Sequence, residues 1–123
     1  MKYALLLGLA LIWGGSAVAQ HAHGSKGPNG GILEDVAGVH AELVTSGNTI
    51  TINILDESNK PLSTQGYTGS VLVVAGSDRE TVKLEPAGAS LKGEAKKAPA
   101  ANAQITLMLK TAAGKSGQAR YKK

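Results

Sequence analysis

Apolar and polar residues alternate along most of this chain, and this period of two constrains the fold more than any other feature of the sequence. The clearest case is residues 49–54 (TITINI), and residues 104–110 (QITLMLK) repeat the pattern later in the chain. In an extended strand, the side chains at positions i and i+2 lie on the same face. Each run therefore predicts a β-strand with one apolar face and one polar face.

Further runs with the character of short strands lie between and beyond these two. They are residues 39–44, 70–75, 80–85, a short run near Leu91, and 118–121. Turn residues separate the runs about every ten residues, a spacing typical of antiparallel β-domains. The best helical candidate, residues 95–103, is interrupted by Pro99. We predict an all-β fold, a single antiparallel β-sandwich (Ig-like or a small barrel) of seven or eight short strands.

The composition argues against several classes of function. The chain contains no cysteine, so it has no thiolate for a zinc site, a redox site or nucleophilic catalysis. It also has neither a nucleophile elbow nor a phosphate-binding loop, and we expect no enzymatic activity. The net charge is +4, but aromatic residues are not interleaved with the basic ones. This indicates a solvated basic surface and no binding of nucleic acid.

Residues 1–19 have the three parts of a secretory signal peptide. Lys2 supplies a positive charge, residues 3–13 (YALLLGLALIW) form an apolar run, and Ala17-Val18-Ala19 is a small-residue cleavage site. The apolar run is shorter than the roughly 20 residues that a helix needs to cross a bilayer. We expect Sec-type export, cleavage after Ala19, and a periplasmic mature chain that is not inserted in the membrane.

The segment after the cleavage site differs in composition from everything that follows it. Residues 20–31 (QHAHGSKGPNGG) contain several glycines and a proline but no large apolar side chain. Such a segment has no apolar surface to bury. We therefore expect a flexible His/Gly-rich tail that ends in a turn, followed by the β-domain over residues 32–123.

The histidines are the side chains best suited to bind a ligand. His21 and His23 form an H-x-H pair, and in an extended chain both imidazoles can reach one ion. His40 precedes Glu42 by two residues on the polar face of a predicted strand, and Asp35 would join them if the intervening chain bends. Nitrogen ligands without sulfur favour Cu(II), with Ni(II) and Zn(II) as alternatives. We predict a metal site formed by His21, His23 and His40. Glu42 would be a weaker ligand or would orient His40.

Other interpretations of these residues remain open. An H-x-H pair in a tail can be incidental, and a single histidine on a strand is usually exposed or hydrogen-bonded to a neighbour. The chain would then be a β-domain that contacts a membrane-bound partner through a sheet edge or its turns. An enzyme that uses copper held by the tail is a third alternative. Met108 could bind Cu(I), but a single methionine on a strand more often serves packing or lies on the surface.

Residues 21–61 resemble small periplasmic proteins of proteobacteria. The similar segments are H-x-H at His21, G-P-N-G-G at residues 27–31, H-x-E-L at His40 and D-x-x-x-K-P at residues 56–61. Segments of this kind also occur near the start of periplasmic adaptor subunits of heavy-metal efflux pumps. The chain lacks the hairpin and lipoyl-like parts of such an adaptor, and it lacks methionine-rich stretches typical of copper carriers.

This resemblance implies that the protein handles copper or another heavy divalent cation in the periplasm. It points to His21, His23 and His40, and less strongly to Glu42. Together with the residues themselves, it predicts a buffer or carrier of a divalent metal ion. Such a protein could be accessory to a metal efflux protein of the membrane.

Intact-mass analysis of the exported protein tests the signal peptide. We expect the mature chain to begin at Gln20, free or cyclised, because Ala17 and Ala19 occupy the two small-residue positions of the cleavage site. A mass that retains Met1 would contradict export through this segment. A start at His21 would instead place an α-amine and an imidazole on one residue, which makes a stronger Cu(II) chelate.

Overall fold

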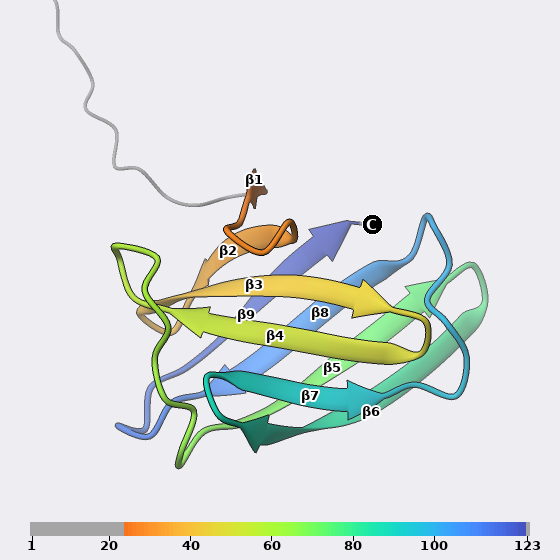
Figure 1. Cartoon of the computed structure of the whole chain (residues 1–123). Helices are drawn as coiled ribbons and strands as arrows, with labels where there is room; N and C mark the ends of the chain where they lie inside the picture. The colour runs from red at the N-terminus through yellow and green to blue at the C-terminus, as the bar shows by residue number, and fades with distance from the viewer. Residues whose placement is uncertain (1–23, 123) are drawn as a thin grey trace, which may run out of the picture.

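The computed structural model describes residues 24–122, and every regular element within them is a β-strand (Figure 1). The signal peptide, His21 and His23 lie outside the described residues. Because residues 24–122 contain no helix, this part of the chain has none that could cross a membrane. The strands are β1 (Ser25–Lys26), β2 (Ile32–Val36), β3 (Val39–Ser46), β4 (Thr49–Leu55), β5 (Thr68–Ala75), β6 (Asp78–Ala87), β7 (Ser90–Glu94), β8 (Gln104–Lys110) and β9 (Ser116–Lys122).

These strands form one antiparallel sheet in the order β1-β2-β3-β4-β7-β6-β5-β8-β9. The sheet curls into a half-barrel, with β3, β4 and β7 on one side and β5, β8 and β9 on the other (Figure 1). Strand β6 connects the two sides, because residues 78–84 pair with β5 and residues 85–87 pair with β7. Each side therefore turns its apolar face toward the same interior.

The predicted all-β antiparallel fold is confirmed. The described part of the chain has nine strands instead of seven or eight. The two strands that were not among the predicted runs are β1 and β2. Strand β1 has only two residues, both polar, and in β2 (ILEDV) two apolar neighbours are followed by two acidic ones, so neither shows a clear alternation. The sheet is continuous, so a sandwich of two separate sheets is not confirmed.

The core consists of the inward side chains of the long strands. Ile50, Ile52 and Ile54 on β4 are fully buried, as their alternation with polar residues predicts. They belong to one cluster with the inward residues of the other strands, including Leu91, Val71, Val82, Ile105, Leu107 and Leu109. Apolar burial stabilises a fold by roughly 25 cal/mol per Å². A chain without disulfides depends on a single continuous core of this kind.

Tyr121 is the largest fully buried side chain and joins the two sides of the half-barrel. It lies on β9, and its hydroxyl donates a 2.9 Å hydrogen bond to the carbonyl oxygen of Ala41 on β3. Burial raises the pKa of Tyr121, and the negative charge of Glu34 raises it further. The hydroxyl therefore stays protonated at neutral pH and remains a donor.

Replacement of Ile52 tests the position of the core. Ile52→Ala should lower the free energy of unfolding by about 2–5 kcal/mol, because it removes buried methyl groups and leaves a cavity. Met108→Ala is the matched control, since Met108 is 43% exposed on β8. It should change stability far less. Chemical denaturation of both variants gives the comparison, and equal losses would contradict this core.

Candidate metal-binding site

A tight hairpin brings Asp35 and His40 together. Strands β2 and β3 pair up to Val36 and Val39, which leaves Ala37 and Gly38 as a two-residue loop. Both loop residues have positive φ, 51° for Ala37 and 86° for Gly38. Positive φ at both central positions is the geometry of a type I′ turn, which matches the twist of the strands. Asp35 and His40 are consequently direct cross-strand partners.

The His40 imidazole lies between two oxygen atoms. Its Nε2 is 3.1 Å from Oδ1 of Asp35, and its Nδ1 is 3.0 Å from Oδ1 of Asn59. Asp35 thus lies beside His40, an approach that the sequence allowed only if the chain between them bends. A carboxylate beside one imidazole nitrogen fixes the orientation of the ring, as it does around many histidine ligands of metals. The other nitrogen faces Asn59, which comes from a turn far along the chain.

That turn is shaped by Asp56. One carboxylate oxygen of Asp56 accepts hydrogen bonds from the backbone N–H groups of Ser58 (2.8 Å) and Lys60 (2.9 Å). The hydrogen bond from Lys60 does most to lower the pKa of Asp56. The ionised carboxylate thus stabilises the turn above its unfolded-state pKa, and that contribution is lost as the pH falls through the lower folded-state value. Asn59 lies in this turn with a φ of 64° and faces His40.

Glu42 lies on the same side of β3 as His40 but is completely buried. Its Oε2 accepts hydrogen bonds from the backbone N–H groups of Asn29 and Gly31, both at 2.8 Å. Its Oε1 accepts one from Nδ2 of Asn29 at 2.7 Å and a longer one from Nδ2 of Asn53 at 3.4 Å. The polar-face position predicted for Glu42 is therefore covered by the turn of residues 27–31. The carboxylate is the acceptor that holds this turn.

The glycines of the G-P-N-G-G segment allow this close contact. A Cβ atom on Gly27 would lie 2.5 Å from Cδ of Glu42. A Cβ atom on Gly31 would collide with the carbonyl oxygen of Leu43. The G-P-N-G-G segment thus forms a turn, and the H-x-E-L segment, which is separate in the sequence, supplies the carboxylate beneath it. The sequence analysis did not predict this role. The signal for it was a turn whose backbone N–H groups, those of Asn29 and Gly31, need acceptors, followed in the sequence by an acidic residue, Glu42, on a predicted strand.

The N-terminal end of the described chain is also bound to the sheet. Strand β1 pairs with β2, with Ser25 opposite Leu33 and Lys26 opposite Ile32. The N–H of Gly24 donates to Oε2 of Glu34 at 2.9 Å. Residues 24–31 are the described part of the predicted flexible tail. They are held to the sheet by these contacts, which differs from the prediction. Gly24, at the start of the segment, lies beside Glu34, the residue before Asp35.

The structure joins some of the predicted site residues and leaves others outside its description. It places His40 beside Asp35, and it gives Glu42 hydrogen bonds to the turn of residues 27–31. His21 and His23 are not among the described residues. Within residues 24–122, no group of three His, Asp or Glu side chains could hold a metal ion. No protein-family model matches the chain, and no curated protein or solved structure matches it.

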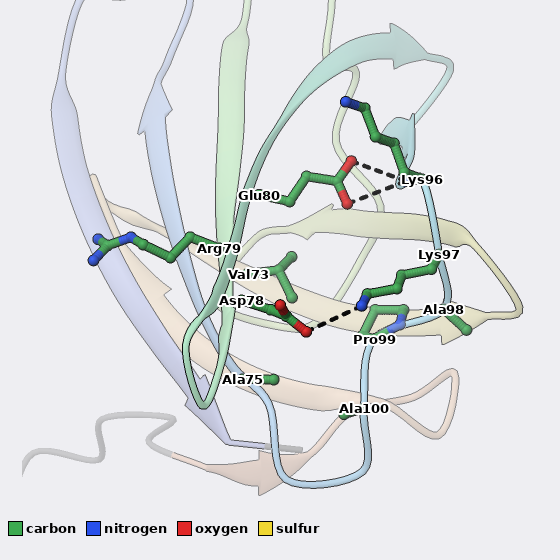
Figure 2. A pocket seen from close by; sticks show the side chains of 10 residues that line it. All are labelled: Val73, Ala75, Asp78, Arg79, Glu80, Lys96, Lys97, Ala98, Pro99 and Ala100. Carbon is green, nitrogen blue, oxygen red and sulfur yellow. Dashed lines mark hydrogen bonds and ion pairs between the residues drawn. The ribbon is translucent and has the colours of Figure 1, made fainter.

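A cleft of about 550 Å³ lies elsewhere, between β6 and the loop of residues 95–103 (Figure 2). The Lys97 ammonium is 3.0 Å from a carboxylate oxygen of Asp78. Both carboxylate oxygens of Glu80 accept the backbone N–H of Lys96, at 2.8 and 3.1 Å. The Lys97–Asp78 ion pair and the hydrogen bonds from the Lys96 backbone to Glu80 fasten the loop to β6. The arrangement indicates a structural role, and no histidine lines the cleft.

Glu42→Gln tests the role of the buried carboxylate. The variant retains the size of the side chain but replaces one carboxylate oxygen with an NH₂ group. That group cannot accept the hydrogen bonds that the oxygen accepts from the N–H donors of the turn. We expect the free energy of unfolding to fall by about 1–3 kcal/mol. Amide exchange at Asn29 and Gly31 should accelerate. Glu57→Gln, in an exposed turn, should change stability by less than about 0.5 kcal/mol. Similar effects of the two substitutions would show that Glu42 does not hold the turn.

Proposed function

We propose that the mature chain is a periplasmic metal-binding protein that buffers or carries a divalent ion, with Cu(II) preferred. The observation that supports this most directly is the Asp35–His40 pair beside the anchored N-terminal segment. Histidines that bind metals in proteins are commonly oriented by a carboxylate that accepts a hydrogen bond from the other ring nitrogen. The chain offers nitrogen and oxygen ligands but no thiolate, and this set suits Cu(II), Ni(II) or Zn(II).

His40 would bind the ion through Nδ1. In the neutral tautomer that binds a metal through Nδ1, Nε2–H would donate to Asp35 and hold the ring in place. Nδ1 would then carry a lone pair facing the amide oxygen of Asn59, which lies in an exposed turn and would move aside. Because two acceptor atoms cannot share a hydrogen bond, opening this position would break none in that tautomer.

His21 and His23 would supply the remaining nitrogens. His23 directly precedes Gly24 in the sequence, and the N–H of Gly24 is held by Glu34, the residue before Asp35. Asp35 is itself opposite His40. A loop that joins the two histidines through one ion is therefore short, and closing so short a loop carries only a modest entropic cost.

Glu42 would support this site without ligating the metal. Its two oxygens already accept four hydrogen bonds, among them those from Asn29 and Gly31. Moving it to a metal would leave buried N–H groups unsatisfied, at a cost of roughly 1–3 kcal/mol each. We therefore propose that Glu42 fixes the turn from which the histidine-bearing segment extends.

The resemblance of residues 21–61 to periplasmic proteins and efflux adaptors supports metal handling outside the cytoplasm. Under this proposal the signal peptide exports the chain, and the protein passes its ion to, or receives it from, a metal efflux protein of the membrane. No catalytic step is part of the proposal.

Isothermal titration of the processed protein with Cu(II), Zn(II) and Ni(II) tests this function. Replacing His21 and His23 together should abolish tight binding, because it removes both tail imidazoles. His40→Ala should weaken binding and leave a complex confined to the tail. Asn59→Gly is the control, since glycine accepts the positive φ and the change frees Nδ1. It should preserve or increase the affinity.

The pH dependence of binding is part of the same test. The tail imidazoles must be neutral to bind, so affinity should fall as the pH drops below about 6.5, the ordinary pKa of histidine. Unchanged affinity in the double histidine variant would exclude metal binding at these residues. Unchanged affinity in His40→Ala would restrict the site to the tail.

A further inference from the structure

The outer face of strands β5, β6, β8 and β9 is basic. Outward and inward positions alternate along these strands, and the inward apolar side chains at their centres are buried. Over residues 68–75, 78–84, 104–110 and 116–122, the outward positions carry no acidic side chain. Their basic side chains are Arg79, Lys83, Lys110, Arg120 and Lys122. Figure 2 shows Arg79 directed away from Glu80 and from the loop that carries Lys96 and Lys97.

The register of the sheet spreads these charges in two dimensions. Arg79, Val74, Gln104 and Lys122 form one row across four strands. Its two ends are therefore about 14 Å apart, three strand spacings. Along β6, Arg79 and Lys83 are separated by about 13 Å, four residues of extended chain. An extended acidic peptide would present its charges along a line, whereas this patch covers an area.

The centre of the patch is apolar. Leu72 and Val74 are partly exposed, and Met108 is the exposed large hydrophobic residue of the described chain, at 43%. Met108 also lines a shallow hollow of about 600 Å³, together with Ser70, Lys83 and Lys110. The only ion pair that reaches this hollow among the described residues joins Lys83 to Glu85 at 3.8 Å, with both side chains highly exposed. Such exposed pairs are weak, so Lys83 can exchange Glu85 for another anion.

We propose that this face docks on an anionic phospholipid surface. A bilayer displays phosphate groups over an area, which fits the two-dimensional spread of Arg79, Arg120 and Lys122. A headgroup phosphate would enter the hollow between Lys83 and Lys110. Met108 would contact the boundary between the headgroups and the acyl chains, where a flexible apolar side chain is favoured. This face does not include the Asp35–His40 pair, so the proposal stands independently of metal binding.

Co-sedimentation with lipid vesicles tests the proposal on the mature chain. Binding should occur to vesicles of phosphatidylcholine mixed with phosphatidylglycerol but not to vesicles of phosphatidylcholine alone. It should weaken as salt is added, because salt screens exposed charges. Each basic side chain near an anionic surface strengthens binding by roughly fivefold. The double variant Arg79→Gln/Arg120→Gln should therefore bind about 25-fold more weakly.

The matched control is Lys60→Gln/Lys96→Gln. It has the same net charge as the first double variant, but both lysines are exposed and lie in loops outside the basic face. It should bind the mixed vesicles almost as well as the unmodified chain. All four substitutions are at exposed positions, and thermal unfolding checks that both variants fold. Equal losses in the two variants would overturn the proposal, because net charge alone would explain binding. Absence of binding to mixed vesicles, with binding to soluble polyglutamate, would assign the face to an acidic protein instead.

Discussion

A sheet with one apolar face must cover that face, and the described part of this chain has no helix with which to do so. The sequence also contains no cysteine that could staple the strands. The sheet meets this requirement by curling until the inward residues of β3, β4 and β7 share one interior with those of β5, β8 and β9. Tyr121 then connects the two sides through its hydrogen bond to Ala41. The outward faces, and every candidate site on them, follow from this curl.

Curling leaves one outward region that is not exposed. The turn of residues 27–31 lies over β3, and the carboxylate beneath it, that of Glu42, satisfies backbone N–H groups that would otherwise be buried without acceptors. The residues most suggestive of a ligand-binding motif therefore divide between two roles. Glu42 and the glycines are structural, whereas His40, held by Asp35, retains a nitrogen whose partner lies in an exposed turn.

The two proposed sites lie on different parts of the same sheet. The proposed metal site would use His40 and Asp35 on β3 and β2 together with His21 and His23, and the proposed lipid-facing patch would use β5, β6, β8 and β9. A protein with both properties would hold a metal ion close to the membrane surface. That location suits exchange with a membrane-bound efflux protein, which is the partner class suggested by the resemblance of residues 21–61.

The sequence by itself determined the strands and their faces, because side-chain alternation is a local property of an extended chain. It thereby determined that Ile50, Ile52 and Ile54 point inward and that Met108 points outward. It also made the Asp35–His40 contact predictable, since only four residues separate them and a two-residue loop joins their strands.

Contacts between distant segments were decided by the tertiary structure alone. The approach of Asn59 to His40, the burial of Glu42 beneath residues 27–31 and the bond from Tyr121 to Ala41 all depend on strand order and curl. The basic residues of β6, β8 and β9 likewise become one patch only when β5 and β8 pair between them. An alternation with a period of two determines which face of the strand a side chain occupies. It carries no information about which strand becomes the neighbour, because that choice depends on how all the strands together close the core.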